Sequence, residues 1–112
     1  MKRVLVVEDH WMTVDNLVAI CREAGCEVKV AMSLAEVEAM AKEKFDIFVW
    51  DYNLPDGTTL EAIKVARKRD SEATMIASSS DPESRLLQVI AGCNIEVDPY
   101  SIYGVLEKEV EK

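Results

Sequence analysis

Three acidic residues follow directly after two short, largely apolar segments of the chain. Glu8 and Asp9 come after Val4–Val7, and Asp51 comes after the run at 45–50. Apolar runs of this length are typical of strands that are buried on both faces of a parallel sheet. Ligands collect outside the carboxyl ends of such strands, and a group of carboxylates there suits a hard cation such as Mg²⁺. The spacing therefore predicts a magnesium site built from these acids.

The segments that would position the acids alternate between strand and helix along the chain. Strands are predicted at 3–8, 26–31, 45–50, 73–79 and 94–97. Helices are predicted at 13–24, 34–44, 58–69, 82–91 and from 99–101 almost to the C-terminus. Strand–helix units joined by short loops predict an α/β fold, with a doubly wound parallel sheet that is covered on both faces.

Local signals mark where several of these helices begin and end. Residues 33–36 and 58–61 have the Ser/Thr-x-x-Glu pattern of a capping box. The pair at 81–82, Asp followed by Pro, is typical of an N-cap and the first helical position. Gly25 and Gly92 are placed where glycine commonly ends a helix.

Length and composition limit what the chain can be. Its 112 residues are enough for one domain with a real core and too few for two, so residues 1–112 are expected to form a single domain. The net charge of −8 argues against direct binding to nucleic acid or to anionic membranes. The apolar stretches are too short to cross a bilayer, and the first residues lack a signal peptide's apolar region. Three cysteines without a CxxC pair are interpreted as reduced thiols of a cytoplasmic protein.

Three motifs, taken in order, resemble one known family. They are Val-Leu-Val-Val-Glu-Asp at 4–9, Asp-Tyr-Asn-Leu-Pro-Asp-Gly at 51–57, and the hydroxyl residue Ser79 at the end of the fourth predicted strand. With these motifs at the expected strand ends, the whole chain resembles the receiver domain of two-component response regulators. The resemblance implies a flavodoxin-like (βα)5 fold with strand order 2-1-3-4-5, in which the first and third strands are neighbours.

The resemblance also implies a role for each acid. Asp51 is similar to the phosphoacceptor, which takes a phosphoryl group from a kinase histidine. Glu8, Asp9 and Asp51 are expected to bind Mg²⁺, and the backbone carbonyl of Asn53 is expected to complete the protein's share of the ligands. A cation that bridges acceptor and phosphoryl oxygens neutralises charge and aligns the reacting groups, so that a weak carboxylate nucleophile can form an acyl phosphate.

A hydroxyl at the end of the fourth strand completes the expected site. Ser79 resembles the switch hydroxyl, which turns to meet a phosphoryl oxygen and begins a two-state change in the surrounding loops. Residues 78–80 are all serine, and neighbouring strand residues face opposite sides, so a shift of one residue changes the choice.

The chain departs from the family where the fifth strand ends. Receiver domains carry a lysine before a proline at this point, and that lysine pairs with the phosphoryl group. Here the residue before Pro99 is Asp98, and no lysine lies between Lys68 and Lys108. The family's Lys–Pro bond also implies that the Asp98–Pro99 peptide bond is cis.

Asp98 has two interpretations. If its carboxylate faces the site, a phosphoryl oxygen about 4 Å away is repelled by roughly 4 kcal/mol per charge pair, at an effective dielectric constant of about 20. If Asp98 is instead the N-cap of the last helix, with Pro99 at the first helical position, its side chain turns outward and the lysine contact is absent. The capping interpretation is favoured.

Two functions are consistent with these residues. The first is a receiver domain that accepts a phosphoryl group on Asp51 with Mg²⁺, from a sensor histidine kinase or a phosphotransfer protein, and signals by conformational change. Such a domain is not an enzyme beyond self-catalysed phosphotransfer and dephosphorylation. The alternative is a diverged pseudo-receiver that binds a protein partner without stable phosphorylation, which Asp98 supports. A small phosphatase-like enzyme would need a cap domain and a general acid that the sequence lacks.

Overall fold

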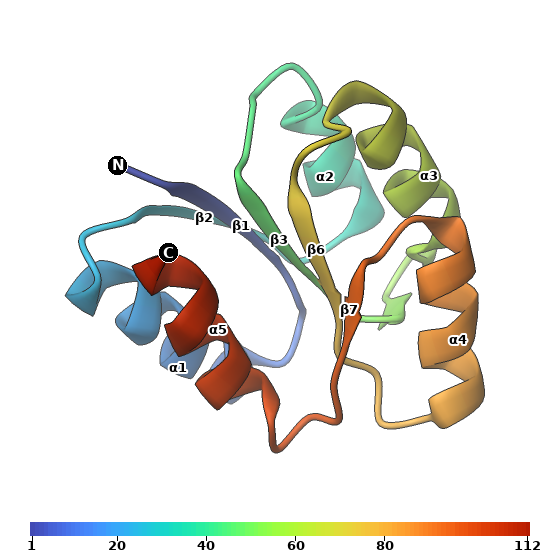
Figure 1. Ribbon diagram of the computed structural model, residues 1–112. Coiled ribbons are helices and arrows are strands. Elements are labelled where there is room, and N and C mark those ends of the chain that lie inside the picture. The colour runs from blue at the N-terminus through green and yellow to red at the C-terminus, as the bar shows by residue number, and fades with distance from the viewer.

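The structure, a computed structural model that describes residues 1–112, is built on one parallel sheet (Figure 1). The strand order is β2-β1-β3-β6-β7, so the predicted flavodoxin-like order is confirmed. The strands are β1 (Arg3–Val7), β2 (Glu27–Ala31), β3 (Ile47–Trp50), β6 (Thr74–Ala77) and β7 (Ile95–Glu96). Each strand continues into a helix that returns across the sheet, as a parallel arrangement requires.

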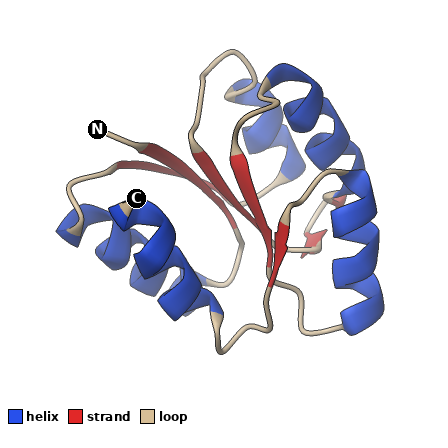
Figure 2. Cartoon of the chain, in the orientation of Figure 1, coloured by secondary structure: helices blue, strands red, loops and turns tan.

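Helices cover both faces of this sheet (Figure 2). They are α1 (Trp11–Glu23), α2 (Leu34–Ala39), α3 (Leu60–Arg69), α4 (Pro82–Ala91) and α5 (Ile102–Glu111). Helices α1 and α5 lie on one face, where the core includes Leu17 and Leu106. Helices α2, α3 and α4 lie on the other face, where the core includes Trp50 and Ile63. No helix is both long and apolar enough to cross a membrane.

The register of the three central strands determines where the acids lie. Val7 pairs with Trp50, and Trp50 pairs with Ala77, so these strands end level with one another. The backbone N–H of Asp51 donates to the carbonyl of Val7 at 2.9 Å, which extends the pairing of β1 and β3 beyond the last paired residues. The residues that follow β1 and β3 therefore emerge side by side at the carboxyl edge of the sheet.

Several of the predicted helix ends are confirmed by their hydrogen bonds. The side chain of Ser33 caps α2 by accepting from the N–H of Glu36 at 3.1 Å. The carboxylate of Asp81 caps α4 by accepting from the backbone N–H of Ser84 at 3.3 Å and from its hydroxyl at 2.8 Å. Gly25 and Gly92 end α1 and α4 with φ values of 76° and 148°, which other residues rarely adopt.

Two details of the predicted helices are wrong. Helix α2 ends at Ala39 rather than at 44, and turns continue the chain toward β3. The capping box at 58–61 does not form, because Thr58 belongs to β5 (Gly57–Thr58), which pairs with β4 (Asn53–Leu54) in a hairpin. Thr59 is the N-cap residue of α3, and its hydroxyl donates to the Asp51 carbonyl instead of making a cap hydrogen bond.

The end of the fifth parallel strand settles the interpretation of Asp98. Its carboxylate accepts from the backbone N–H groups of Tyr100 at 2.9 Å and Ser101 at 3.0 Å, so it caps the turn that leads into α5. Asp98 is exposed and does not face the site, as the favoured interpretation requires. The predicted helix start is wrong, because α5 begins at Ile102 with Ser101 as its N-cap residue, and Pro99 lies in the preceding turn. The predicted cis bond before Pro99 is wrong, because the chain contains no cis peptide bond.

Gly92 provides a test of how tightly α4 is joined to its neighbours. A Cβ at this position would lie 2.9 Å from the Cβ of Arg67, and the φ of 148° disfavours any side chain. We expect Gly92→Ala to lower the free energy of unfolding by about 1–3 kcal/mol in urea denaturation. Gly104→Ala in α5 is the matched control, because a Cβ there meets no atom within 4 Å. It should raise the free energy by about 0.5–1 kcal/mol, and equal effects of both variants would refute this account.

Candidate metal site at the carboxyl edge

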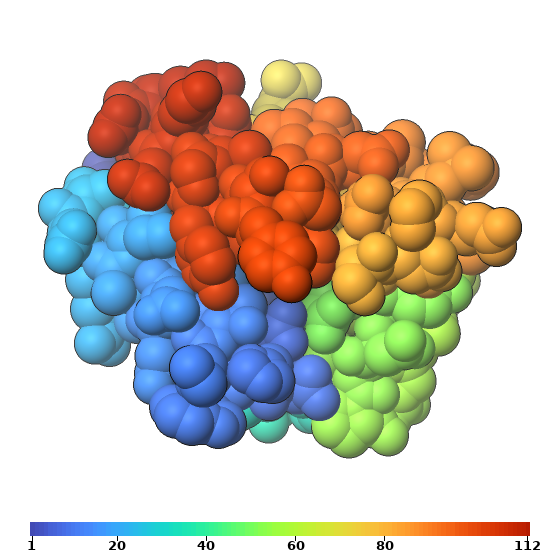
Figure 3. All heavy atoms as spheres, turned by 90° about the horizontal axis from the view of Figure 1, so that it is seen from below, coloured from blue at the N-terminus to red at the C-terminus, as the bar shows by residue number.

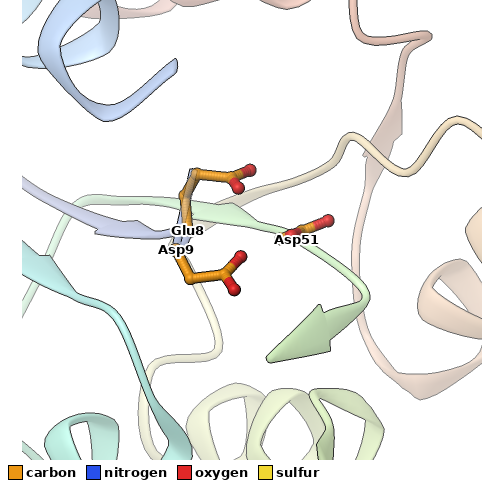
Figure 4. Close-up of side chains that lie close together, drawn as sticks. All are labelled: Glu8, Asp9 and Asp51. Atoms are coloured by element: carbon orange, nitrogen blue, oxygen red, sulfur yellow. The ribbon is translucent and has the colours of Figure 1, made fainter. Parts of the chain in front are cut away.

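The three predicted acids meet at the ends of β1 and β3. One carboxylate oxygen from each of Glu8, Asp9 and Asp51 lies within 4.8 Å of the others. Figure 4 shows the side chains of Glu8 and Asp9 directed toward Asp51. The sequence-based prediction that these acids lie together is therefore correct, and its cause is the register that places Val7 beside Trp50.

Glu8 is the most perturbed of these acids. Only 8% of the residue is exposed, and burial is the main reason that its pKa is raised from 4.5 to about 7. The negative charge of Asp51 raises the pKa further, because two carboxylates at short range repel. The backbone N–H of His10 donates to Glu8 at 3.0 Å and partly opposes the shift.

The pKa of Asp51 is also raised, but less than that of Glu8. Burial raises its pKa, and the charge of Asp9 acts in the same direction. The N–H of Tyr52 donates to Oδ1 of Asp51 at 2.8 Å and favours the ionised form. A hydrogen bond with Glu8 also lowers the pKa of Asp51 while it raises that of Glu8. Glu8 is therefore the acid that more readily holds a proton, and Asp51 the one that more readily stays charged.

The donor set fits a hard divalent cation. All of the side-chain donors are carboxylate oxygens, which Mg²⁺ prefers. Two oxygens bound to the same Mg²⁺ are at most about 4.2 Å apart, which small rotations of these side chains would achieve from a separation of 4.8 Å or less. A bound cation would also offset the repulsion between carboxylates, which adds to the effect of burial on both pKa values. The residues that would hold it are Glu8, Asp9 and Asp51.

Two buried polar residues hold the backbone behind Asp51, and sequence analysis did not identify either. The hydroxyl of Thr59 donates to the Asp51 carbonyl at 2.5 Å. The amide of Gln88 donates to the carbonyls of Asp51 at 3.0 Å and Trp50 at 3.2 Å. Thr59 and Gln88 are fully buried. Helix α4 thus contacts the main chain of Asp51 directly.

The sequence pattern of α4 conceals this contact. Its buried residues are Ser84, Gln88 and Ala91, whereas Leu86 and Ile90 are 55% and 72% exposed. Hydrophobic periodicity would place the leucine and isoleucine inward, so it gives the wrong face for this helix. The only sequence signal for the buried face is that Ser84, Gln88 and Ala91 are spaced four and three residues apart, which places them on one side of a helix.

The remaining predicted site residues follow β3, β6 and β7 along the chain. Figure 3 shows the molecule from below, where segments from the beginning (blue), middle (green) and end (orange to red) of the chain lie side by side. Asn53 is exposed at the start of β4, two residues beyond Asp51. Ser79 is buried, and its hydroxyl accepts from the N–H of Asp81 at 3.2 Å. The N–H of Ser78 donates to the Trp50 carbonyl at 3.2 Å, which continues the pairing of β6 with β3. Ser78 therefore lies beside Asp51 at the edge, and Ser79 lies one residue beyond it.

The fold is shared with solved receiver domains. A response regulator receiver domain protein from Methanospirillum hungatei JF-1 matches with a TM-score of 0.83 and 23% identity, over 99% of this chain and 94% of that one. Chemotaxis response regulator CheY4 of Vibrio cholerae matches with a TM-score of 0.82 and 24% sequence identity, over 98% of both chains. A response regulator from Burkholderia pseudomallei was solved with a phosphorylated aspartic acid and a calcium ion. It matches with a TM-score of 0.81 and 19% sequence identity, over 99% of this chain and 69% of that one.

These likenesses establish the fold class, which is that of the flavodoxin-like receiver domains. The response regulator receiver domain family matches residues 4–97, and the chain belongs to that family. Receiver domains are signalling domains and not classical enzymes. No curated protein sequence is significantly similar to this chain.

The raised pKa of Glu8 predicts how stability depends on pH. Because the folded pKa of about 7 lies above the ordinary value of 4.5, Glu8 stabilises the fold below the ordinary value, and this contribution is lost as the pH rises through 7. In buffer with a chelator, we expect the free energy of unfolding to fall by at most about 3 kcal/mol between about pH 4.5 and about pH 7.5.

Glu8→Gln is the variant that isolates this effect. Its amide oxygen can still accept from the N–H of His10, as Glu8 does at 3.0 Å, but the side chain no longer titrates. The variant should therefore lose less stability over the same pH range in urea denaturation. A pH dependence identical to that of the wild type would show that another group is responsible.

Proposed function

We propose that this chain is a phosphoacceptor receiver domain of a two-component or phosphorelay system. Asp51 takes the phosphoryl group, Mg²⁺ is the cofactor, and the signal is a conformational change of the surrounding loops. The observation that carries the proposal is the position of Asp51 at the end of β3, with its carboxylate near those of Glu8 and Asp9. The backbone carbonyl of Asn53 is proposed as a further metal ligand.

The proposed chemistry is a transfer between two side chains. A carboxylate oxygen of Asp51 attacks the phosphorus of a phosphohistidine, and the P–N bond breaks. The imidazole nitrogen keeps the electron pair of that bond and takes up a proton, while Asp51 becomes an acyl phosphate. Mg²⁺, when bound, supplies charge neutralisation for the phosphoryl oxygens. Dephosphorylation is the attack of water on the same phosphorus, which returns the carboxylate.

The chain's own residues support this reaction by orientation. The N–H of Tyr52 donates to Oδ1 of Asp51 at 2.8 Å, and the Asp51 carbonyl is held by Thr59 and Gln88. Such contacts fix the rotation of the nucleophile before the phosphoryl donor arrives. A sensor histidine kinase or a phosphotransfer protein is the proposed donor. We further propose that residues 1–112 form a single receiver domain that works in the cytoplasm.

Titration with beryllofluoride, a phosphoryl analogue, tests this function. We expect calorimetry to give saturable binding of Mg²⁺ and then of beryllofluoride, and we expect Asp51→Asn to abolish the second step because it removes the anionic acceptor. Tryptophan fluorescence is a second readout, since Trp50 directly precedes Asp51 in the chain. Binding of Mg²⁺ without any response to beryllofluoride would favour the alternative, a diverged pseudo-receiver that binds a protein partner without stable phosphorylation.

The choice of switch hydroxyl is also testable. Ser79 is the residue that the family resemblance selects. Its hydroxyl accepts from the N–H of Asp81 at 3.2 Å, and the hydroxyl of Ser78 donates to the Trp50 carbonyl at 3.4 Å. Ser78 lies beside Asp51 by register, which supports it as the residue that meets the phosphoryl group. We expect Ser78→Ala to weaken beryllofluoride binding about tenfold or more, the usual cost of a lost hydrogen bond to a charged group. Ser79→Ala should have a smaller effect, and the reverse order would return the role to Ser79.

A further inference from the structure

We propose that Arg85 is the cation that compensates the negative charge of the phosphorylated site. This inference rests on the proposed function of Asp51. A dianionic acyl phosphate on Asp51, together with Glu8 and Asp9, brings four negative charges to the edge, and one Mg²⁺ cancels two of them. A second source of positive charge is therefore needed for a stable phosphorylated state.

Arg85 is placed to provide that charge. The region near the acids consists of the loops that leave the carboxyl ends of the parallel strands and the first four residues of each following helix. Of the 13 lysine and arginine residues of the chain, only Arg85 lies in this region. Position 98 supplies no cation, because Asp98 is acidic and its carboxylate is occupied by the turn before α5. Arg85 therefore has no competitor among the lysines and arginines at this edge, and the other side chain there that can carry positive charge is His10, which favours the ionised form of Asp51.

The contacts of Arg85 hold its guanidinium at the end of β6, the strand that pairs with β3. Nη1 donates to the carbonyl of Ser79 at 2.6 Å, at the end of β6, and the side chain is only 13% exposed. Gln88, three residues later on the same helix, donates to the Asp51 carbonyl at 3.0 Å. Residues three apart lie next to each other on a helix surface. Arg85 is thus a neighbour of a side chain that already contacts Asp51.

Glu96 holds the guanidinium in the unmodified protein. Its carboxylate accepts from Nε of Arg85 at 3.2 Å and is 48% exposed. A guanidinium has five N–H donors, and the bonds to Glu96 and Ser79 use two of them. Arg85 therefore keeps free donors for a phosphoryl oxygen, and it can also exchange its partner Glu96 for the phosphoryl group, which a guanidinium matches in geometry. Asp81 is the other carboxylate that faces it.

Two variants that break the same ion pair distinguish this role from a structural one. With Mg²⁺ at saturation, we expect Arg85→Gln to weaken beryllofluoride binding about tenfold or more. Glu96→Gln should instead strengthen it about threefold, because it removes a competing negative charge and leaves Arg85 free. Both variants lose the ion pair of Arg85 with Glu96, so a merely structural pair would shift binding in the same direction for both.

Further variants complete the design. Arg67→Gln removes another partly buried arginine, one that donates to the Gly92 and Ala73 carbonyls, and it should leave beryllofluoride binding unchanged. Arg85→Lys keeps the charge and should lose less affinity than Arg85→Gln. Adding Asp98→Lys to Arg85→Gln restores a cation beyond β7 and should recover part of the lost affinity.

The outcomes separate this inference from the proposed function. If the wild type binds beryllofluoride, Asp51→Asn does not, and Arg85→Gln binds as the wild type does, the receiver function stands and the role of Arg85 is refuted. Weakening by both Arg85→Gln and Glu96→Gln also refutes it, in favour of a structural ion pair. Absence of beryllofluoride binding in the wild type overturns both.

Discussion

Repulsion between carboxylates at the carboxyl edge is the constraint on which the site depends. The backbone pairing of β1 with β3, including the bond from the Asp51 N–H to the Val7 carbonyl, holds Glu8, Asp9 and Asp51 together. Two such charges 4.8 Å apart repel by roughly 3–4 kcal/mol at an effective dielectric constant of about 20. Packing of the sheet therefore stabilises an arrangement that its own charges oppose. A proton on Glu8 or a bound cation relieves this repulsion, which makes the edge responsive to both.

The parts of this structure that depend on local sequence were predictable. The apolar runs, the caps at Ser33 and Asp81 and the glycine at 92 place the strands and most helices, and alternation of strand and helix then determines the sheet. The acids were predictable because each follows a strand directly. The capping pattern at Thr58 is not used, because Thr58 pairs with Asn53 in the β4–β5 hairpin, and this pairing joins residues across a turn. The contact of Gln88 with Asp51 depends on how α4 packs, which no local pattern records.

Helix α4 is the element in which local preference and tertiary packing disagree. Its buried face carries Ser84 and Gln88, while Leu86 is exposed. The polar network beneath it is incomplete, since Oε1 of Gln88 and Nε1 of Trp50 are buried without a hydrogen-bond partner. Partly satisfied buried networks are costly in a low-dielectric interior. The attachment of α4 to β3 is therefore weaker than its burial suggests.

The same helix carries the proposed counter-charge, and this links charge compensation to movement. In the family a strand lysine meets the phosphoryl group, and a strand is fixed by its neighbours in the sheet. Here Asp98 accepts hydrogen bonds in a turn, and the arginine at this edge is Arg85 on α4. If Arg85 exchanges Glu96 for a phosphoryl oxygen, the attraction between guanidinium and phosphoryl group acts on α4. The same helix carries Gln88, which donates to the Asp51 carbonyl. Phosphorylation would then act on α4 directly, through its own side chains, and would not require a cation from β7.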